Sequence, residues 1–348
     1  MSDIDIRTTG RAGRITLTRS QALNAMTYDM CMGIDTAMRN WREDESVDLV
    51  IIDAEGDKAF CAGGDIAELF DTGTKGDFAY GRRFWRDEYR LNALIAEYPK
   101  PVVSFLQGFT MGGGVGLGCH GSHRVVCETS QIAMPECGIG LIPDVGGSMI
   151  LSHAPGHVGE YLGTTAGRMD ADDAIFAGFA DHFLPRDIWG DVIDLLEASG
   201  QADHVTAHAQ PPAPGALRHR QDDIDRHFHS ASLDGVLASL QAGHNAFSEK
   251  ALKSMFRNSP LSMACTIEMI RRLRDAPADI RTALELEYRF TFRAMELGDF
   301  LEGIRAQIID KDRNPKWQFQ DRNVPDPVVQ DMLRSLGPDT LTFEEDQR

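Results

Sequence analysis

The chain has 348 residues, of which 42% are hydrophobic, and its formal net charge at pH 7 is -18. This length and composition allow a substantial core, either in one large domain or in a domain with an appended helical region. The negative charge argues against nucleic acid and against an anionic membrane as partners, because both are bound through clustered Lys and Arg.

The cysteines and the first residues indicate the compartment. Six cysteines occur without a CxxC pair and mostly in apolar surroundings, which is typical of reduced, buried thiols, so we expect no disulfide. The chain has no run of about 18 uninterrupted apolar residues, and its acidic N-terminus differs from the basic start of a targeting peptide. We therefore expect a cytoplasmic protein that does not span a membrane.

The first elements predict a hairpin followed by a helix and a buried strand. Alternating apolar residues on both sides of a glycine-containing turn predict two short strands within residues 4–18. Apolar residues then recur at helical spacing from Met30 to Trp41, and a strand buried on both faces follows at residues 48–53. A helix that leads into such a strand indicates an α/β fold.

A segment of mostly small residues, at residues 58–66, follows the predicted strand at residues 48–53. Within residues 58–66, Ala62, Gly63 and Gly64 precede Asp65 and a helical run. Small residues at a strand-to-helix turn let main-chain N–H groups approach a ligand, and the helix N-terminus adds a partial positive charge. A tight turn capped by Asp65 is the competing, purely structural interpretation.

A second turn of this kind follows the predicted strand at residues 100–106, where Gly112, Gly113 and Gly114 open a helix. Two such turns at neighbouring parallel strands could each direct one N–H at a shared point, which is the geometry of an oxyanion hole. The glycines fit neither a P-loop, which needs GxxxxGK[ST], nor a dinucleotide fingerprint, which needs an acid after a second strand.

Two acids lie in residues 134–147 among apolar residues, glycines and prolines, with no basic residue in the stretch. Glu136 follows a short predicted strand, and Asp144 precedes Val-Gly-Gly. An ionised acid removed from water without a partner costs several kcal/mol or shifts its pKa, so both are candidate catalytic groups. The competing interpretation is that Glu136 faces water and that Asp144 caps a short helix.

The second half of the chain is mainly helical, and its Pro-rich stretch at residues 210–215 is typical of a linker. The run after Trp317 is polar and interrupted by prolines. We therefore divide the chain into a catalytic core, a C-terminal helical region and a loosely attached polar tail, at residues 1–210, 216–320 and 321–348.

Three of these stretches together resemble the crotonase (enoyl-CoA hydratase/isomerase) superfamily, namely residues 58–66, 108–118 and 134–147. More narrowly, the motifs MPECGIGLIPDVGG, FWRDEYRLN, GFTMGGGVGLGCHG and IIDKDRNPKW resemble the 3-hydroxyisobutyryl-CoA hydrolase family. The likeness extends over residues 4–317. It implies an α/β crotonase-like spiral of repeated ββα units, an acyl-CoA ligand and a C-terminal helical region that completes the site.

Carried over by position, the resemblance assigns the oxyanion-hole N–H groups to Ala62 and Gly113. It makes Glu136 and Asp144 the catalytic acids and places Glu88 in the lining of the substrate pocket. The remaining substrate-binding positions lie in the two turns, at Gly63, Gly64, Asp65 and Gly112. Lys58, just before the first turn, is expected to contact the CoA moiety, whose phosphates need basic residues nearby.

The reaction that the resemblance implies is hydrolysis of a short branched hydroxyacyl-CoA thioester, such as 3-hydroxyisobutyryl-CoA in valine catabolism. Glu136 would act either as the general base for water or as a nucleophile that forms an acyl-enzyme anhydride. Asp144 would hold the substrate hydroxyl or orient Glu136 and the water. No metal and no separate cofactor are expected. The superfamily suggests a homo-oligomer, with a trimer favoured; the alternative is that the C-terminal region covers the same surface within one chain.

Two other functions stay open. Enoyl-CoA hydration or isomerisation is disfavoured because the hydratases of the superfamily carry an acid where this chain has Gly116. A non-catalytic acyl-CoA-binding scaffold would keep ligand affinity without turnover. A nucleophilic Cys137–His120 dyad is disfavoured because an isolated Cys in an apolar run is usually inert packing. A metal site at His204 and His208 lacks a third ligand.

Overall fold

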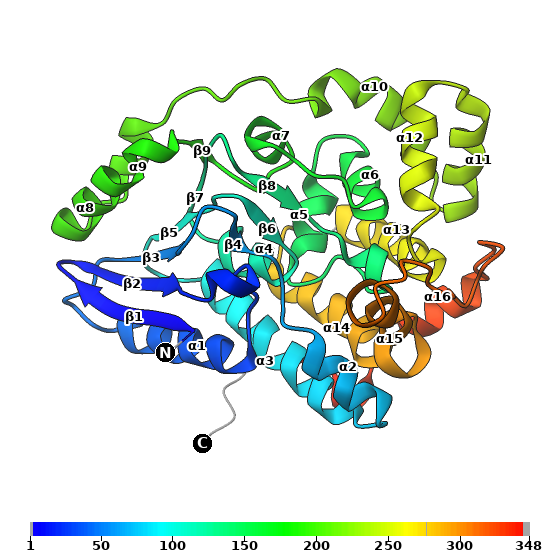
Figure 1. Ribbon diagram of the computed structural model, residues 1–348, viewed down its shortest axis with the longest axis horizontal. Coiled ribbons are helices and arrows are strands. Elements are labelled where there is room, and N and C mark those ends of the chain that lie inside the picture. Colours follow the sequence, from blue (N-terminus) through cyan, green and yellow to red (C-terminus); the bar gives the residue numbers. More distant parts are fainter. Residues whose placement is uncertain (1–2, 276, 344–348) are drawn as a thin grey trace. The chain divides into compact units, whose positions relative to one another are not determined.

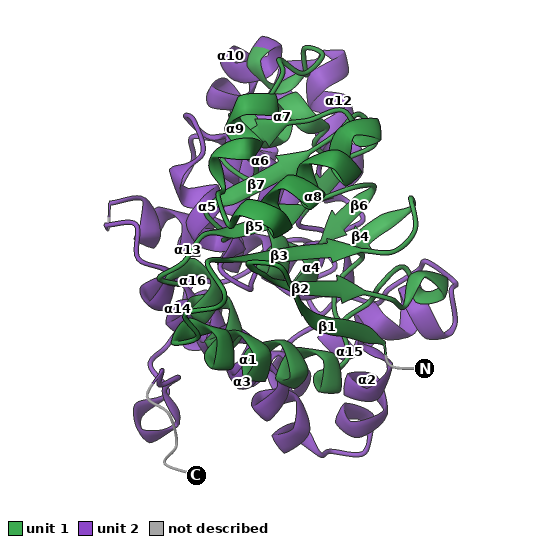
Figure 2. Cartoon of the chain, turned by 90° about the vertical axis from the view of Figure 1, so that its left-hand side faces the viewer, with its two compact units in different colours: residues 1–64, 90–133, 168–218 green, residues 65–89, 134–167, 219–348 purple. Residues whose placement is uncertain are grey.

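The computed structural model describes residues 3–275 and 277–343 (Figure 1). The chain forms two compact units that interleave along the sequence (Figure 2). Unit 1 comprises residues 1–64, 90–133 and 168–218, and unit 2 comprises residues 65–89, 134–167 and 219–348. The first two residues of the acidic N-terminus lie outside the described residues.

These two units differ from the three consecutive regions that the sequence predicts, because each unit is assembled from separate segments of the chain. The boundary predicted between residues 210 and 216 lies near the last change of unit, at residue 218. Residues 65–89 and 134–167 of the predicted core, however, belong to unit 2. Local patterns predict single elements, but the unit in which an element packs depends on partners that are distant in sequence.

A six-stranded sheet organises unit 1. The hairpin strands β1 and β2 are antiparallel, and the other neighbouring strands are parallel. The strand order is β1-β2-β3-β5-β7-β9, with bounds Ile4–Thr9, Ala12–Leu17, Leu49–Ala54, Val102–Phe105, His123–Val126 and His182–Phe183. Every residue of β3 is buried, so the predicted hairpin and the predicted doubly buried strand are both confirmed.

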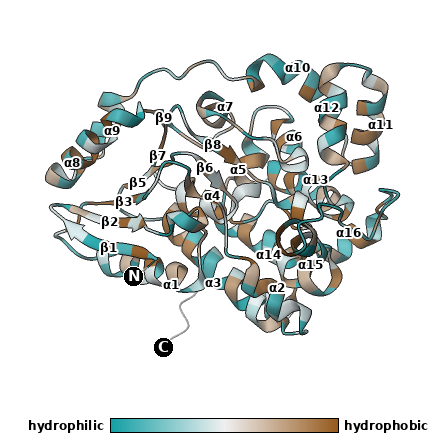
Figure 3. Cartoon of the chain, in the orientation of Figure 1, coloured by the Kyte–Doolittle hydropathy of each residue, from teal (hydrophilic) through white to brown (hydrophobic). Residues whose placement is uncertain are grey.

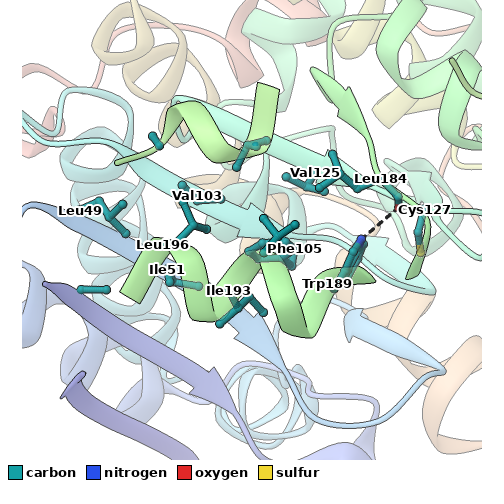
Figure 4. Close-up of a cluster of buried hydrophobic side chains, with 14 residues drawn as sticks. Leu49, Ile51, Val103, Phe105, Val125, Cys127, Leu184, Trp189, Ile193 and Leu196 are labelled. Atoms are coloured by element: carbon teal, nitrogen blue, oxygen red, sulfur yellow. Dashed lines mark hydrogen bonds between the residues drawn. The ribbon is translucent and has the colours of Figure 1, made fainter. Parts of the chain in front are cut away.

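The core of unit 1 forms between this sheet and helix α8 (Trp189–Ser199) (Figure 4). Alternate residues of the central strands, such as Val103 and Phe105, join the cluster because strand side chains point to one face with a period of two. The Trp189 ring lies 5.1 Å from the Phe105 ring, and its Nε1–H donates to the Leu184 carbonyl oxygen at 3.0 Å. The buried indole is therefore both packed and hydrogen-bonded.

A second, three-stranded parallel sheet in unit 1 consists of β4 (Ala59–Cys61), β6 (Phe109–Met111) and β8 (Gln131–Ala133). Its strand β4 pairs with β6 through Cys61 and Thr110. The short helix α4 (Gly113–Gly118) begins directly after β6. The two glycine-rich turns therefore follow neighbouring parallel strands, as predicted.

Unit 1 also contains helix α1 (Tyr28–Arg42) and four shorter helical elements. Helix α1 is capped by the Thr27 side chain, which accepts the Met30 N–H. Its buried residues include Met30, Ile34, Met38 and Trp41, the apolar series that predicted it. The shorter elements are η1 (Ser20–Ala22), α7 (Ala171–Phe176), η3 (Arg186–Ile188) and α9 (Asp203–His208).

Unit 2 is built from helices. Helix α3 (Phe78–Ala96) begins in unit 2 and ends in unit 1, and α10 (Leu217–Phe228) begins in unit 1 and ends in unit 2. The N-terminal elements are α2 (Ala67–Thr74), η2 (Glu136–Ile139), α5 (Gly147–His153) and α6 (Val158–Thr165). The C-terminal ones are α11 (Leu233–Gly243), α12 (Ala246–Met255), α13 (Pro260–Arg274), α14 (Ile280–Leu297), α15 (Phe300–Ile304), the π-helix η4 (Arg305–Ile309), α16 (Asp326–Met332) and η5 (Gly337–Asp339).

The C-terminal helices of unit 2 bury apolar residues along one face. Helices α11 and α12 carry both hydrophobic and hydrophilic residues (Figure 3). Helix α13 packs against α5 and α6, which brings the C-terminal helices onto the segment that follows the two candidate acids. None of the helices in residues 3–275 and 277–343 combines the length and apolar character that a membrane crossing requires.

The predicted loose tail is wrong for residues 321–343. Helix α16 packs against α13 and α14, and the Arg293 guanidinium of α14 donates to the Met332 carbonyl oxygen at 3.1 Å. The apolar residues that anchor it lie at helical spacing among polar ones, at Val329, Met332 and Leu333. The prediction for residues 344–348 lies outside the described residues.

Candidate active site

The two glycine-rich turns of unit 1 approach each other closely. A Cβ atom added at Gly114 would lie only 2.2 Å from the Cys61 carbonyl oxygen, so only glycine allows this approach. Gly63 and Gly112 have φ angles of +115° and +51°, which side chains rarely permit. The bare backbone is therefore a requirement of the geometry.

The N–H groups at these turns correct one predicted assignment. The Ala62 N–H donates to the Leu23 carbonyl oxygen at 3.0 Å and is already engaged. By contrast, neither the Gly64 N–H nor the Gly113 N–H donates a loop hydrogen bond within residues 3–275 and 277–343. Gly113 is the first residue of α4, where an N–H has no intrahelical acceptor. Gly64 therefore replaces Ala62 as the candidate donor beside Gly113.

Lys58 lines a cavity of about 400 Å³ in unit 1, together with Asn24, Glu55 and Asp57. The Asn24 amide donates to the carbonyl oxygens of Glu55 and Ala59, both at 3.0 Å, and so fixes one wall. The Lys58 ammonium forms no ion pair with a described residue. A CoA contact at Lys58 stays a prediction.

Among the buried carboxyl groups of unit 2, four bear on the candidate site. They belong to Glu88, Glu136, Asp144 and Glu287, none of which is more than 4% exposed. No Lys or Arg of the described residues forms an ion pair with any of them. Helix α5 has Gly146 at its N-cap and no side-chain cap, so Asp144 does not cap it. Both structural interpretations of the acids are thereby excluded.

Burial raises the pKa of all four carboxyl groups because a charge is poorly solvated there. The pKa values of Glu88 and Glu136 rise well above the ordinary range, and the nearby charge of Asp144 adds to the effect. The pKa of Asp144 rises to about 7 and that of Glu287 to about 8. The cluster therefore holds protons near neutral pH and can exchange them there.

Tyr89 orients Asp144. Its hydroxyl donates to Asp144 Oδ2 at 2.8 Å and lies 3.4 Å from Thr291 Oγ1. This hydrogen bond stabilises the ionised carboxyl and opposes the rise in its pKa. Glu136 Oε2, in contrast, is buried without a hydrogen-bond partner among the described residues. An acceptor left unsatisfied in this way is costly, and it suits a group that meets water or substrate.

Glu287 was missed by the sequence analysis. Its carboxylate accepts the N–H groups of Gly146 and Ser148 at 2.8 and 3.1 Å, and it also accepts the Ser148 hydroxyl. The available signal was its spacing, since Glu287 falls on the apolar face of α14 between Leu284 and Phe290. A carboxylate on such a face is expensive unless it is paired.

The structure also describes the surroundings of two other candidate residues, Asp65 and Cys137. The Asp65 side chain accepts the Ala67 N–H at 3.3 Å, although the N-cap residue of α2 is Ile66. The Cys137 thiol lies 3.4 Å from Thr266 Oγ1, and burial raises its pKa to about 12, so it is a poor nucleophile. No group of three or more metal-ligating side chains occurs in the described part of the chain.

The buried acids predict a pH-dependent stability. Unfolded Asp and Glu titrate near pH 4, whereas folded Asp144 and Glu287 titrate near 7 and 8. Their favourable contribution is complete below the unfolded pKa values and is lost as pH rises through the folded ones, at about 1.4 kcal/mol per pH unit and group. Urea unfolding at about pH 5 and about pH 8 should therefore show wild type losing on the order of 5 to 7 kcal/mol relative to a D144N/E287Q variant. An equal change in the free energy of unfolding of both proteins between these two pH values would contradict this prediction.

The chain matches the family model described as enoyl-CoA hydratase/isomerase over residues 12–333. It is 37% identical to the 3-hydroxyisobutyryl-CoA hydrolase, mitochondrial, of Danio rerio over 332 residues, which cover 91% of this chain and 85% of that protein. Its identity to the protein of the same name from Homo sapiens is 34%, covering 96% of this chain and 89% of that protein.

Two solved structures share the fold along almost the whole chain. An enoyl-CoA hydratase from Rhodobacter sphaeroides 2.4.1 is 54% identical with a TM-score of 0.95, covering 98% of this chain and 100% of that one. A carnitinyl-CoA dehydratase from Mycobacterium thermoresistibile is 36% identical with a TM-score of 0.94, covering 99% and 100%. These matches confirm the predicted α/β fold with its C-terminal helical region.

Proposed function

Because the chain belongs to the enoyl-CoA hydratase/isomerase family, whose members act on acyl-CoA, we propose that it hydrolyses the thioester of a short branched hydroxyacyl-CoA. The substrate we favour is 3-hydroxyisobutyryl-CoA, the compound in the names of the curated relatives. The observation that carries the proposal is the buried pair Glu136 and Asp144, in which one oxygen of Glu136 lacks a partner among the described residues.

In this mechanism, the Gly64 and Gly113 N–H groups stabilise the negative charge that develops on the thioester oxygen. Each fixed donor of this kind contributes roughly 3 to 4 kcal/mol to the lowering of a barrier. The N–H groups are suited to this because their turns are held by close backbone contact, so little reorganisation is needed when charge develops.

Glu136 activates the attack on the carbonyl carbon. As a general base it takes a proton from water, the water oxygen bonds to carbon, and the proton then passes to the CoA sulfur as the C–S bond breaks. As a nucleophile, its carboxylate oxygen bonds to the carbonyl carbon while the C–S bond breaks and CoA leaves as the thiolate, which then takes up a proton; water hydrolyses the resulting anhydride in a second step. Both routes need the ionised form of Glu136, and the raised pKa makes that form more basic than an ordinary carboxylate. Asp144, oriented by Tyr89, holds the substrate hydroxyl or the water.

Enoyl-CoA hydration is the second candidate, and the solved structure at 54% identity favours it because that protein is named an enoyl-CoA hydratase. Under this proposal Glu136 and Asp144 would form the acid pair that handles the added water. Against it stands Gly116, which lies buried in α4 and offers no carboxylate at the position where hydratases carry an acid. A non-catalytic scaffold is the third candidate, and it leaves four costly buried acids without a use.

The test offers purified protein 3-hydroxyisobutyryl-CoA and, separately, crotonyl-CoA. A thiol reagent reports free CoA, and ultraviolet absorbance reports loss of the conjugated double bond. Hydrolysis predicts rapid thiol release from the first substrate. Absorbance loss from crotonyl-CoA without thiol release would favour the hydratase, and binding of both thioesters without any turnover would favour the scaffold.

The proposal extends to the cellular compartment and the oligomeric state of the protein. We propose a cytoplasmic protein because all six cysteines are free and buried, although the curated relatives are named mitochondrial. We also propose a homo-oligomer with a trimer favoured, which light scattering of the purified protein tests.

A further inference from the structure

A strained turn follows Asp144 directly. Val145 has a φ angle of +52°, and Gly146 has one of +79°. The left-handed region is natural for glycine but unfavourable for a β-branched residue such as valine. Backbone strain of this kind persists only where the surrounding structure holds it. Unit 2 must therefore supply contacts that fix this turn.

Glu287 of α14 supplies them. Its Oε2 accepts the Gly146 N–H at 2.8 Å, and its Oε1 accepts the Ser148 N–H at 3.1 Å together with the Ser148 hydroxyl. The side chain is completely buried, so water does not compete for these hydrogen bonds. Both oxygens are thus used to hold the backbone two and four residues after Asp144.

The same helix reaches the Asp144 side chain by a second route. Thr291 lies one helical turn after Glu287, and its Oγ1 is 3.4 Å from the Tyr89 hydroxyl. That hydroxyl donates to Asp144 Oδ2 at 2.8 Å. Helix α14 therefore touches both the turn that carries Asp144 and the donor that orients its carboxyl.

We propose that Glu287 is a positioning residue, which holds the strained Val145–Gly146 turn and thereby places the Asp144 carboxyl for the reaction. The inference rests on the proposed function, in which Asp144 contacts substrate or water. A direct proton transfer from Glu287 to substrate is disfavoured because both of its oxygens already accept hydrogen bonds from unit 2.

The Glu287→Gln variant tests this with minimal change in shape. Whichever way the amide is turned, its NH2 group faces a backbone N–H, so the variant loses at least one hydrogen bond to the turn. We expect kcat to fall by roughly 10- to 100-fold with KM nearly unchanged, because small misplacements of reacting groups have costs of this size. The pH–rate profile should keep its limbs, because a positioning residue exchanges no proton with the substrate, but it should shift to lower pH, since the Glu287 charge no longer raises the pKa of Glu136.

Glu285→Gln is the matched control. Glu285 lies on the same helix, is 33% exposed and pairs with Arg289 at 2.7 Å. The same chemical change should leave kcat there within about twofold, because the Glu285 carboxylate pairs with Arg289 and not with the turn after Asp144. If Glu285→Gln lowers kcat as much as Glu287→Gln, the effect comes from α14 as a whole, and the proposal is overturned.

A double-mutant cycle with Asp144→Asn separates positioning from an independent role. If Glu287 acts through Asp144, the Glu287→Gln change should cost little further activity once Asp144 is replaced. If the fold losses of activity in the two single variants multiply in the double variant, the proposal is overturned. Disappearance of a limb of the pH–rate profile in Glu287→Gln alone would also overturn it. Ser148→Ala, which removes only the hydroxyl contact, should lower kcat in the same direction but less.

Hydrogen exchange keeps this inference separate from the proposed function. Amides of residues 145–149 should exchange faster in Glu287→Gln than in Glu285→Gln, whatever reaction the protein catalyses. Unchanged exchange in that segment would overturn the inference even for an active hydrolase. Faster exchange in a protein without thioesterase activity would instead support the role of Glu287 in holding the turn and would reject the proposed hydrolase function.

Discussion

Replacing Glu136 with glutamine should lower kcat for thioester hydrolysis by roughly 1,000-fold or more, because the reaction loses its general base or nucleophile. Glutamine has nearly the same shape but accepts no proton and forms no anhydride at a useful rate. Affinity for the CoA thioester should stay within a few-fold of wild type. Single-turnover kinetics with equilibrium binding separate the two quantities.

The same variant should fold at least as stably as wild type near neutral pH. Glu136 is buried with a strongly raised pKa, so its charged form opposes folding, and an amide removes that cost. Glu249→Gln, an exposed change at the start of α12, serves as the control and should affect neither activity nor stability. An active Glu136→Gln variant would remove Glu136 from the mechanism.

Replacing Gly114 with alanine should lower kcat by roughly 100-fold or more, the range seen when an oxyanion-hole donor is lost. The new methyl group would stand 2.2 Å from the Cys61 carbonyl oxygen, and backbone on both sides leaves no flexible atom to move. The two turns must then separate, which displaces the Gly113 N–H next in the chain. Steady-state kinetics with thermal unfolding measure the effect.

Gly118→Ala distinguishes a displaced turn from a weakened helix. Gly118 lies on the same short helix, but its Cβ would meet side chains of Leu106 and Phe60, at 2.5 and 2.9 Å. We expect this variant to lose stability through overpacking and to retain most of its kcat. Equal loss of activity in both variants at equal loss of stability would mean that the turns have no special role.

The sequence predicted those parts of the fold that depend on local pattern. The hairpin, the doubly buried β3 and the amphipathic α1 follow from periodicity, and all three are confirmed. The glycine-rich turns were predictable because close backbone approach leaves few residue types at Gly114. The stretch that carries Glu136 and Asp144 was found because acids without basic neighbours stand out in an apolar segment.

The rest depends on contacts between residues distant in sequence. Whether the Ala62 N–H is available is decided by the Leu23 carbonyl, which no local pattern reveals. Glu287 meets Gly146 across 141 positions of the chain, and Tyr89 meets Asp144 across 55. The attachment of α16 depends on packing against α13 and α14, so its polar composition was misleading.

We propose that this chain breaks a thioester and does not add or remove water at a double bond. Mass spectrometry after incubation of 3-hydroxyisobutyryl-CoA in heavy-oxygen water tests it with one substrate. We predict free CoA and 3-hydroxyisobutyrate with one heavy oxygen in its carboxyl group, from wild type but not from Glu136→Gln. An intact thioester that has lost one water, with no free CoA, would show dehydration and contradict thioester hydrolysis.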